Sequence, residues 1–330
     1  MYVCIYIYIY IYNFIYVQSK RKPNRLFLPR IIRNKQMIKD NKIVFIIVGF
    51  ILSVLALLFR QKQNYNLVPR RIWTYWDNPD NPSKGLPKVV KLCMESWKKF
   101  NPDYEIVLLT KKTVKGYVTI PDEIRTHPHY NDSPQRFADL VRLYVLEEHG
   151  GIWIDASVLV KQSFDEWLFP KYGEFAGYYI GSYGVDTKVP VIENWFLAAN
   201  KGSKFIQRWK QEFIEIKNFK DIQGYLDSRK KMGVNFSKFR DAHYLAAYVA
   251  ALKVIEVDKY PQDALILRDS EQGPFKYLVD SKWHSDKAMA LACIDKKYQT
   301  PLMKMRSDER NFLEKELSHD LSLEKCRWLD

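Results

Sequence analysis

Residues 139–157 read DLVRLYVLEEHGGIWIDAS, which joins a charged pair, a helical segment, a glycine turn and a short apolar strand. The strand ends at the carboxylate of Asp155. Because ligands bind beyond the carboxyl ends of the strands in open α/β sheets, this position favours a ligand site. We therefore expect an α/β fold organised around the segment, with Asp155 directed at a metal–diphosphate group.

The helix of this segment is predicted from its two ends. Ser133 is a typical N-cap, and Pro134 fits the first helical position because its missing N–H would be unpaired there anyway. Gly150 is expected to stop the helix as a left-handed C′ residue. Asp139 and Arg142 are three residues apart and share one face; alone, they would be read as an ordinary surface ion pair.

The strand is expected to alternate its side chains between two faces. Trp153, Asp155 and Ser157 point to one face, and Ile152 and Ile154 point to the other. Taken alone, the aspartate could simply close the strand as a turn residue. The combination with the charged pair and the glycine turn, in this order, favours a functional site.

The segment resembles the signature of glycosyltransferase family 32 and its relatives, which include the capsular polysaccharide synthesis proteins. Their pattern is Asp-x-x-Arg, a helix, Gly-Gly and an aromatic–apolar strand that ends in Asp-x-Asp. Residues 68–76 (VPRRIWTYW) and 96–106 (SWKKFNPDYEI) support the resemblance, which runs from about Pro69 to the C-terminus. It implies a GT-A fold, a single α/β domain with a Rossmann-like nucleotide half, and hexose transfer from a nucleotide-sugar with retention of configuration.

The motif departs from the family pattern at one position. Ser157 stands where the second aspartate is usual, giving Asp-Ala-Ser, a form that the capsular branch often carries. A hydroxyl can ligate a hard cation directly or through water, but it brings no charge. The resemblance therefore implies Mn²⁺ or Mg²⁺ held by Asp155 and Ser157. A catalytically inactive sugar-binding relative stays open as an alternative.

The resemblance makes Asp139, Arg142 and Asp155 the candidate catalytic residues, and it implies no nucleophile. Asp139 would accept hydrogen bonds from the donor sugar, and the planar fork of Arg142 would bridge it to the sugar or the diphosphate. Gly150 and Gly151 would allow close approach of the backbone to the ligand. The amide of Asn194 would bind a sugar hydroxyl, although a capping or turn amide explains it equally well. The acceptor is expected to be a glycan or glycoconjugate.

Three aromatic or imidazole side chains complete the candidates. Trp73 and Trp76 end the first predicted strand, where an indole could stack on the nucleotide base; a place in the core is the alternative for each. His284 is a candidate for the metal shell, although a solvated surface histidine is the commoner case. The choice of a UDP-sugar as donor rests on analogy alone.

Charge and composition restrict the class of protein. The 330 residues are 47% hydrophobic with a net charge of +14. The four cysteines lack zinc or redox spacing, so buried free thiols are expected, with a disulfide among the last three in an oxidising compartment as the alternative. Residues 1–71 carry 13 Lys/Arg against one acid, which leaves 39 Lys/Arg and 37 acids in residues 72–330. Because the second part is nearly neutral, nucleic-acid binding loses its main support. The absence of a Gly-x-x-x-x-Gly-Lys-Ser/Thr loop argues against a phosphotransferase, the other alternative.

The first 36 residues are interpreted as an over-extended gene model. Residues 5–12 alternate isoleucine and tyrosine strictly, which is what an AT dinucleotide repeat encodes in frame. Met37 is the expected start.

Residues 43–59 contain no charged side chain and reach the short limit for crossing a bilayer. We expect an uncleaved signal anchor after a cytosolic tail of residues 37–42, with a cleaved signal peptide as the alternative. Residues 60–67 would form a stem, and residues 68–330 the catalytic domain. The resemblance then favours a type II membrane protein, with its catalytic domain in the lumen of the Golgi or another secretory compartment.

Strands and helices are expected to alternate along the catalytic domain. The pattern predicts strands over Arg71–Trp76 and Tyr104–Thr110, and helices over Lys88–Phe100 and Lys204–Ile216. This order indicates a mostly parallel sheet with helices on both faces.

Overall fold

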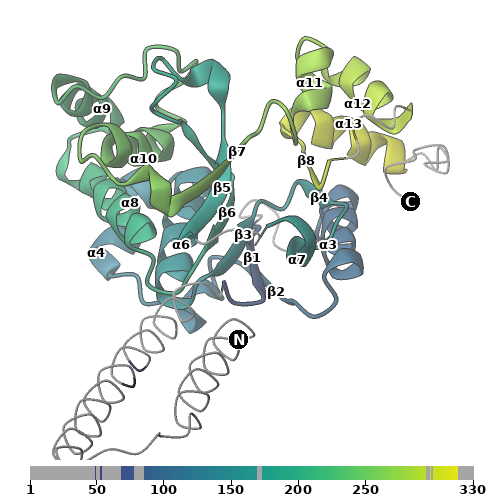
Figure 1. Ribbon diagram of the computed structural model, residues 1–330, viewed down its shortest axis with the longest axis horizontal. Helices are drawn as coiled ribbons and strands as arrows, with labels where there is room; N and C mark the ends of the chain where they lie inside the picture. The colour runs from purple at the N-terminus through teal and green to yellow at the C-terminus, as the bar shows by residue number, and fades with distance from the viewer. Residues whose placement is uncertain are drawn as a thin grey trace, which may run out of the picture. The chain divides into compact units, whose positions relative to one another are not determined.

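The computed structural model describes Gly49, Ser53 and residues 68–77, 85–168, 173–294, 298 and 300–318 (Figure 1). The chain divides into two compact units, Met1–Gln61 and Lys62–Asp330, and all elements given below belong to the second. The expected gene-model boundary, tail, anchor and stem within residues 1–67 lie outside the described residues, apart from Gly49 and Ser53. No helix among the described residues has the length and apolar character needed to cross a membrane.

A six-stranded sheet forms the centre of the second unit, with the strand order β2-β1-β3-β6-β5-β7. Strand β6 is antiparallel to both neighbours, whereas the other neighbouring pairs are parallel, so the predicted mostly parallel sheet is confirmed. A small second sheet pairs β4 with β8 in antiparallel fashion. The strands are β1 (Arg71–Tyr75), β2 (Glu105–Leu109), β3 (Gly151–Ile154), β4 (Val158–Val160), β5 (Phe175–Tyr179), β6 (Ile192–Ala199), β7 (Leu265–Asp269) and β8 (Leu302–Lys304).

Helices cover both faces of the large sheet, as predicted (Figure 1). One face carries α6, α8 and α10, and the other carries α3 and α7, while α11, α12 and α13 follow β7. The helices are α3 (Lys88–Phe100), α4 (Asp122–Arg125), α5 (Pro128–Asn131), α6 (Pro134–His149), α7 (Phe164–Trp167), α8 (Lys204–Ile214), α9 (Ile222–Lys231), α10 (Ala246–Glu256), α11 (Lys276–Asp280), α12 (Ser285–Ile294) and α13 (Ser307–Ser318).

Helix α6 begins and ends where the sequence predicts. The backbone N–H of Arg136 donates to the side-chain oxygen of Ser133 at 3.3 Å, which satisfies one of the unpaired donors of the first turn. Gly150 follows the last helical residue with a φ of +67° and a ψ of −164°, so the helix ends there as predicted, although the glycine does not adopt the left-handed helical conformation. A Cβ atom at this glycine would lie 2.5 Å from the backbone nitrogen of Lys201, so a side chain does not fit.

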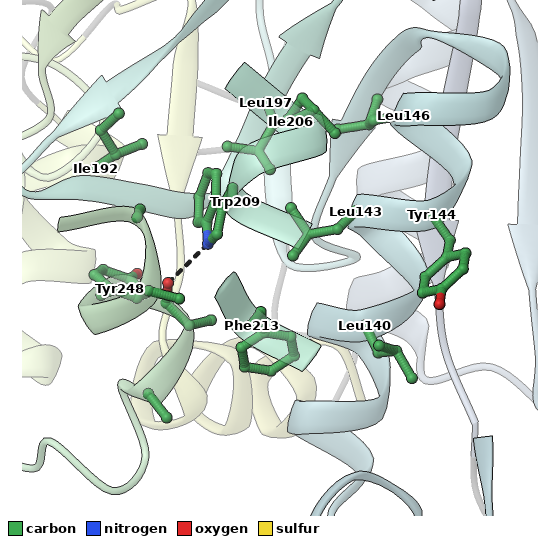
Figure 2. Packing of buried hydrophobic residues seen from close by; sticks show 14 of the residues in the cluster. Leu140, Leu143, Tyr144, Leu146, Ile192, Leu197, Ile206, Trp209, Phe213 and Tyr248 are labelled. Atoms are coloured by element: carbon green, nitrogen blue, oxygen red, sulfur yellow. Dashed lines mark hydrogen bonds between the residues drawn. The ribbon is translucent and has the colours of Figure 1, made fainter. Parts of the chain in front are cut away.

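The core on the α6 face fixes this helix against α8 and α10 (Figure 2). Leu140 and Leu143 of α6 belong to the same buried cluster as Trp209 and Phe213 of α8. The indole N–H of Trp209 donates to the carbonyl oxygen of Ala247 in α10 at 2.8 Å. Burial of each large apolar side chain contributes about 1.5–3 kcal/mol, so the polar residues of α6 sit on a rigid support.

The strand β3 divides its side chains between the two cores, as predicted. Trp153 belongs to the cluster on the α6 face, whereas Ile152 and Ile154 belong to the cluster on the α3 face. On that second face, Trp97 of α3 donates its indole N–H to the carbonyl oxygen of Val158 at 2.7 Å. Helix α3 thereby holds the chain directly after β3.

The thiol of Cys93 in α3 is buried and free, as expected. The side chains of the other three cysteines lie outside the described part of the chain.

Candidate active site

Asp155 lies directly after the last residue of β3. Its backbone N–H donates to the carbonyl oxygen of Trp195 at 2.9 Å, which extends the pairing of β3 with β6 by one residue. This pairing places Asp155 opposite Trp195, the residue after Asn194. The Asp155 side chain is 27% exposed, so its carboxylate is open to solvent at the carboxyl end of the strand.

Asp139 and Arg142 form a buried pair rather than a surface ion pair. Their side chains are 6% and 5% exposed, and Nη2 of Arg142 lies 3.0 Å from Oδ1 of Asp139. The same nitrogen lies 3.4 Å from Oδ1 of Asp155. The amide of Asn194 donates to Oδ1 of Asp139 at 2.7 Å. The structure therefore brings these four predicted site residues into one cluster.

The guanidinium of Arg142 is held on every side by the protein. Its Nη1 donates to the carbonyl oxygen of Asn194, and its Nε donates to that of Ala138 at 3.4 Å. The group lies over the Trp153 ring at 4.9 Å. The indole N–H of Trp153 in turn donates to Oδ1 of Asp155 at 3.1 Å. Two nitrogens of Arg142 thus bind backbone carbonyl oxygens, and the third, Nη2, lies against both carboxylates.

Lys304, which the sequence analysis missed, closes the cluster from β8. Its Nζ donates to Oδ2 of Asp155 at 3.0 Å and to Oγ of Ser157 at 2.9 Å. The Ser157 hydroxyl donates in turn to the carbonyl oxygen of Met305 at 3.0 Å. A single charged residue in the apolar run LMKM of residues 302–305 was the available signal.

The two carboxylates differ in the ease with which they ionise. Burial alone would raise the pKa of Asp155, but the charges of Lys304 and Arg142 outweigh it and hold the pKa below its usual value. Burial raises the pKa of Asp139 to about 6, despite the opposing charge of Arg142. Asp155 is therefore the more firmly ionised group of the cluster.

Glu193 is the second residue that the sequence analysis missed. It is buried in β6, where the hydroxyl of Tyr248 donates to it at 2.6 Å and that of Ser270 at 3.3 Å. Burial raises its pKa to about 7, although these hydroxyl contacts and the charge of Lys304 act against the rise. A charged residue at the start of the mostly apolar run of residues 192–199, next to Asn194, was the signal for it.

The metal ion implied by the resemblance does not fit the donor set as it stands. The two expected ligands, Asp155 and Ser157, are bridged by the ammonium of Lys304. Mg²⁺ requires near-octahedral oxygen ligands at about 2.1 Å. No group of three or more His, Cys, Asp or Glu residues suited to a metal occurs within the described ranges. His284 lies exposed just before α12, and its part in a metal shell stays a prediction.

The prediction of base stacking is wrong for Trp73. Its side chain is 0% exposed because β1 is a central strand covered on both faces, and its indole N–H donates to the carbonyl oxygen of Gly150 at 2.8 Å. Trp76 is half-buried, and the guanidinium of Arg310 lies 5.4 Å from its ring. Base stacking at Trp76 stays a prediction.

The prediction that Gly150 and Gly151 approach the ligand is also wrong. They lie at the start of β3, whereas Asp155 follows its end. A Cβ atom at Gly151 would lie 2.7 Å from the carbonyl oxygen of Arg71. The close approach that these glycines allow is therefore between α6, β3 and the neighbouring strands.

The chain is similar over part of its length to two named glycosyltransferases. An O-glycosyltransferase, braB of Annulohypoxylon truncatum, is 26% identical over 178 residues, which cover 47% of this chain and 40% of that protein. The glycosyltransferase afumC of Aspergillus fumigatus is 27% identical over 160 residues, or 44% of this chain and 39% of that protein. The chain thus spans about 40% of the length of these relatives.

Among solved structures, the galactosyltransferase LgtC in complex with donor and acceptor sugar analogues superposes with a TM-score of 0.39 at 11% identity. The match covers 76% of this chain and 94% of LgtC. PaToxG glycosyltransferase gives a TM-score of 0.36 at 15% identity, over 84% of this chain and 95% of that one.

The model of the capsular polysaccharide synthesis protein family matches residues 24–224, more than half of the chain. The chain therefore belongs to that family. The matched range includes Asp139, Arg142, Asp155, Ser157 and Asn194.

Proposed function

We propose that this protein transfers a hexose from a nucleotide-sugar to a glycan or glycoconjugate, with retention of configuration, on a GT-A type fold. The observation that carries the proposal is the cluster of Asp139, Arg142, Asp155 and Asn194 at the carboxyl end of β3. Ligands of open α/β sheets bind at this edge. UDP-hexose is the first donor to test.

The cluster leaves acceptor atoms for the donor sugar. Oδ1 of Asp139 accepts from Arg142 and Asn194, whereas Oδ2 has no hydrogen-bond partner in the part of the chain that the structure describes. Because this carboxylate is held by a buried guanidinium and an amide, its second oxygen is pre-positioned for a sugar hydroxyl. Such pre-positioning reduces the entropy lost on binding.

The transfer breaks the bond between the anomeric carbon and the diphosphate oxygen, and the electron pair stays on that oxygen. The acceptor hydroxyl attacks from the same face and passes its proton to the leaving diphosphate, which retains the configuration. Fixed positive charge near the diphosphate favours this step because negative charge develops there. Since the observed donor set does not fit Mn²⁺ or Mg²⁺, no step is assigned to a metal.

Nucleotide release from defined donors tests the proposal. We would incubate the full-length chain with a panel of UDP- and GDP-sugars, in Mn²⁺ or in EDTA, together with an Asp155→Asn variant. Release of nucleotide from one donor is expected, with at least a 100-fold loss in the variant. Asp286→Asn, a change at an exposed site on α12, is the matched control.

A donor that binds without turnover would instead support the alternative of a catalytically inactive sugar-binding protein. The neutral Ser157 in place of a second aspartate is the reason for considering this alternative. Absence of both binding and turnover for every donor would contradict the proposed function.

We also propose that residues 43–59 anchor the chain as a type II membrane protein of the Golgi or another secretory membrane. The support is their uncharged composition. In cells, the full-length chain is expected in the membrane fraction after alkaline carbonate extraction, with its C-terminus protected from added protease. Extraction by carbonate, or digestion of the C-terminus in sealed vesicles, would contradict this.

A further inference from the structure

We propose that Lys304 supplies, in place of a divalent metal ion, the positive charge that binds the donor diphosphate. The inference rests on the proposed function and adds to it a metal-independent way to stabilise the leaving group. The family match ends at residue 224, so it assigns no role to Lys304.

The position of Lys304 is fixed by its backbone. Strand β8 pairs with β4, so that Lys304 stands opposite Val158, three residues after Asp155. The backbone N–H of Lys304 donates to the carbonyl oxygen of Pro274 at 3.2 Å, and its own carbonyl oxygen accepts from the Tyr277 hydroxyl at 2.7 Å. The neighbouring Met303 and Met305 are buried. The backbone contacts of Lys304 and its buried neighbours therefore fix its position in the site.

The ammonium of Lys304 lies where the expected metal would lie, between Oδ2 of Asp155 and Oγ of Ser157. Because the Ser157 hydroxyl gives its hydrogen to Met305, its lone pairs accept from the lysine. An ammonium has three N–H donors, and two are used here. The third has no acceptor among the residues that the structure describes, and the side chain is 12% exposed beside the more open Asp155. This donor is available to a phosphate oxygen.

The charges of the cluster already balance without an added ion. Asp139 and Asp155 carry two negative charges, and Arg142 and Lys304 carry two positive ones. A divalent cation on the same oxygens would place two further positive charges against the fixed ammonium, which Coulomb repulsion disfavours. With a neutral hydroxyl at Ser157 instead of a second carboxylate, one ammonium is enough to neutralise the motif.

The diphosphate of a nucleotide-sugar, unlike a metal ion, is attracted by the positive charge of Lys304. It brings negative charge to the exposed side of Lys304, where a charge-assisted hydrogen bond is roughly twice as strong as a neutral one. As the bond to the sugar breaks, the charge on the leaving oxygen grows and the interaction strengthens. A preorganised cation of this kind lowers the barrier without metal binding.

Metal dependence of the wild-type protein is the first part of the test. Nucleotide release by the full-length chain is expected to agree within about twofold in EDTA and in Mn²⁺. Electron paramagnetic resonance is expected to show that adding the protein to Mn²⁺ and UDP removes no free-ion signal beyond the signal lost to UDP alone. Turnover that requires Mn²⁺, with loss of the free-ion signal, would overturn the inference while leaving the proposed function intact.

Variants of Lys304 are the second part. In EDTA, Lys304→Met is expected to reduce nucleotide release at least 100-fold and to weaken UDP binding at least tenfold, while the affinity for uridine stays unchanged. Lys304→Arg keeps the charge and is expected to retain UDP affinity within about threefold. Lys315→Met, at an exposed position of α13, is the matched control and is expected to behave as wild type.

Full metal-free turnover by Lys304→Met would overturn the inference. If that variant does not fold, the wild-type metal measurements and Lys304→Arg decide the question. If the wild-type chain neither binds nor consumes any UDP- or GDP-sugar, the proposed function itself fails, and the inference fails with it.

Discussion

Arg142 holds the two carboxylates of the cluster at fixed distances from one another. Its guanidinium reaches Asp139, Asp155 and two backbone carbonyl oxygens, and it lies over the Trp153 ring. A planar fork can meet these partners together, whereas a lysine ammonium is a single point charge. Removal of one partner from a buried ion pair commonly costs about 3–5 kcal/mol because the other charge is left uncompensated.

Replacement of this arginine by lysine therefore tests the geometry of the cluster rather than its charge. Arg142→Lys is expected to lower kcat/KM for nucleotide release by about 100-fold and the free energy of unfolding by about 1–3 kcal/mol. Urea unfolding and donor turnover measure the two effects. Arg125→Lys, which alters an exposed pair with Asp122, is the control and should change both quantities little. Wild-type activity in Arg142→Lys would contradict the role assigned to the fork.

Glu193 gives the stability of the protein a distinct pH dependence. Its carboxyl has a pKa of about 7 in the folded chain against an ordinary value of 4.5. Between these values the folded chain holds a proton that the unfolded chain has lost, so this group's contribution to stability falls as the pH rises through the window. The fall amounts to about 3 kcal/mol at most.

Glu193→Gln keeps the shape of the side chain and removes its titration. The difference in unfolding free energy between wild type and variant is expected to shift in favour of the variant from pH 4.5 to pH 7. Urea unfolding at several pH values measures it. A difference that stays constant with pH would show that Glu193 titrates normally.

At the scale of elements, the turn between α6 and β3 places the cluster. Gly150 and Gly202 both have positive φ, at +67° and +73°, but their surroundings differ. A Cβ atom at Gly150 would meet the backbone nitrogen of Lys201 at 2.5 Å and the carbonyl oxygen of Ala199 at 2.9 Å, whereas nothing lies within 4 Å of a Cβ atom at Gly202. Alanine substitutions at the two glycines therefore distinguish the cost of a positive φ from the cost of a steric clash.

Gly202→Ala is expected to cost about 1 kcal/mol, because only the left-handed conformation is penalised. Gly150→Ala adds a backbone clash at a buried turn and is expected to cost at least about 3 kcal/mol, or to prevent folding. Thermal unfolding of the two variants measures the difference. Equal destabilisation would mean that the α6–β3 turn can move away from β6 without loss.

The elements around this turn could be predicted because their signals are local. The caps and spacing of residues 133–150, the alternation in β3 and the amphipathic pattern of α3 each arise within one segment. Trp73 could not be placed, because its burial depends on β2 and β3 flanking β1 on either side. Lys304 could not be placed either, since a three-residue strand shows no periodicity and its partner, β4, lies far away in the chain. Predictions for single residues therefore failed where the pairing of distant strands determines which groups surround the side chain.

At the scale of the whole molecule, a contact between α13 and the N-terminus of α3 supports the site. Helix α3 has no side-chain N-cap of its own, because Pro87 precedes it. The carboxylate of Glu314 in α13 accepts instead from the backbone N–H groups of Lys88 at 2.9 Å and Val89 at 2.8 Å. A carboxylate at a helix N-terminus satisfies unpaired donors and opposes the positive end of the helix dipole. The Glu314 contact thus joins α3, which supports the chain after β3, to the segment that carries β8.

Loss of the Glu314 charge is expected to lower the stability of the protein without altering the chemistry of the site. Glu314→Gln should lower the free energy of unfolding by about 1–2 kcal/mol, within the range for helix N-caps and charge–dipole contacts. Glu316→Gln, two residues further along α13, is the control and should cost little. Urea unfolding gives the stabilities, and nucleotide release in the native range checks the site. If Glu314→Gln is as stable as the control, the carboxylate does not secure α3, and the pairing with β4 and the other contacts of Lys304 are enough to hold β8 in place.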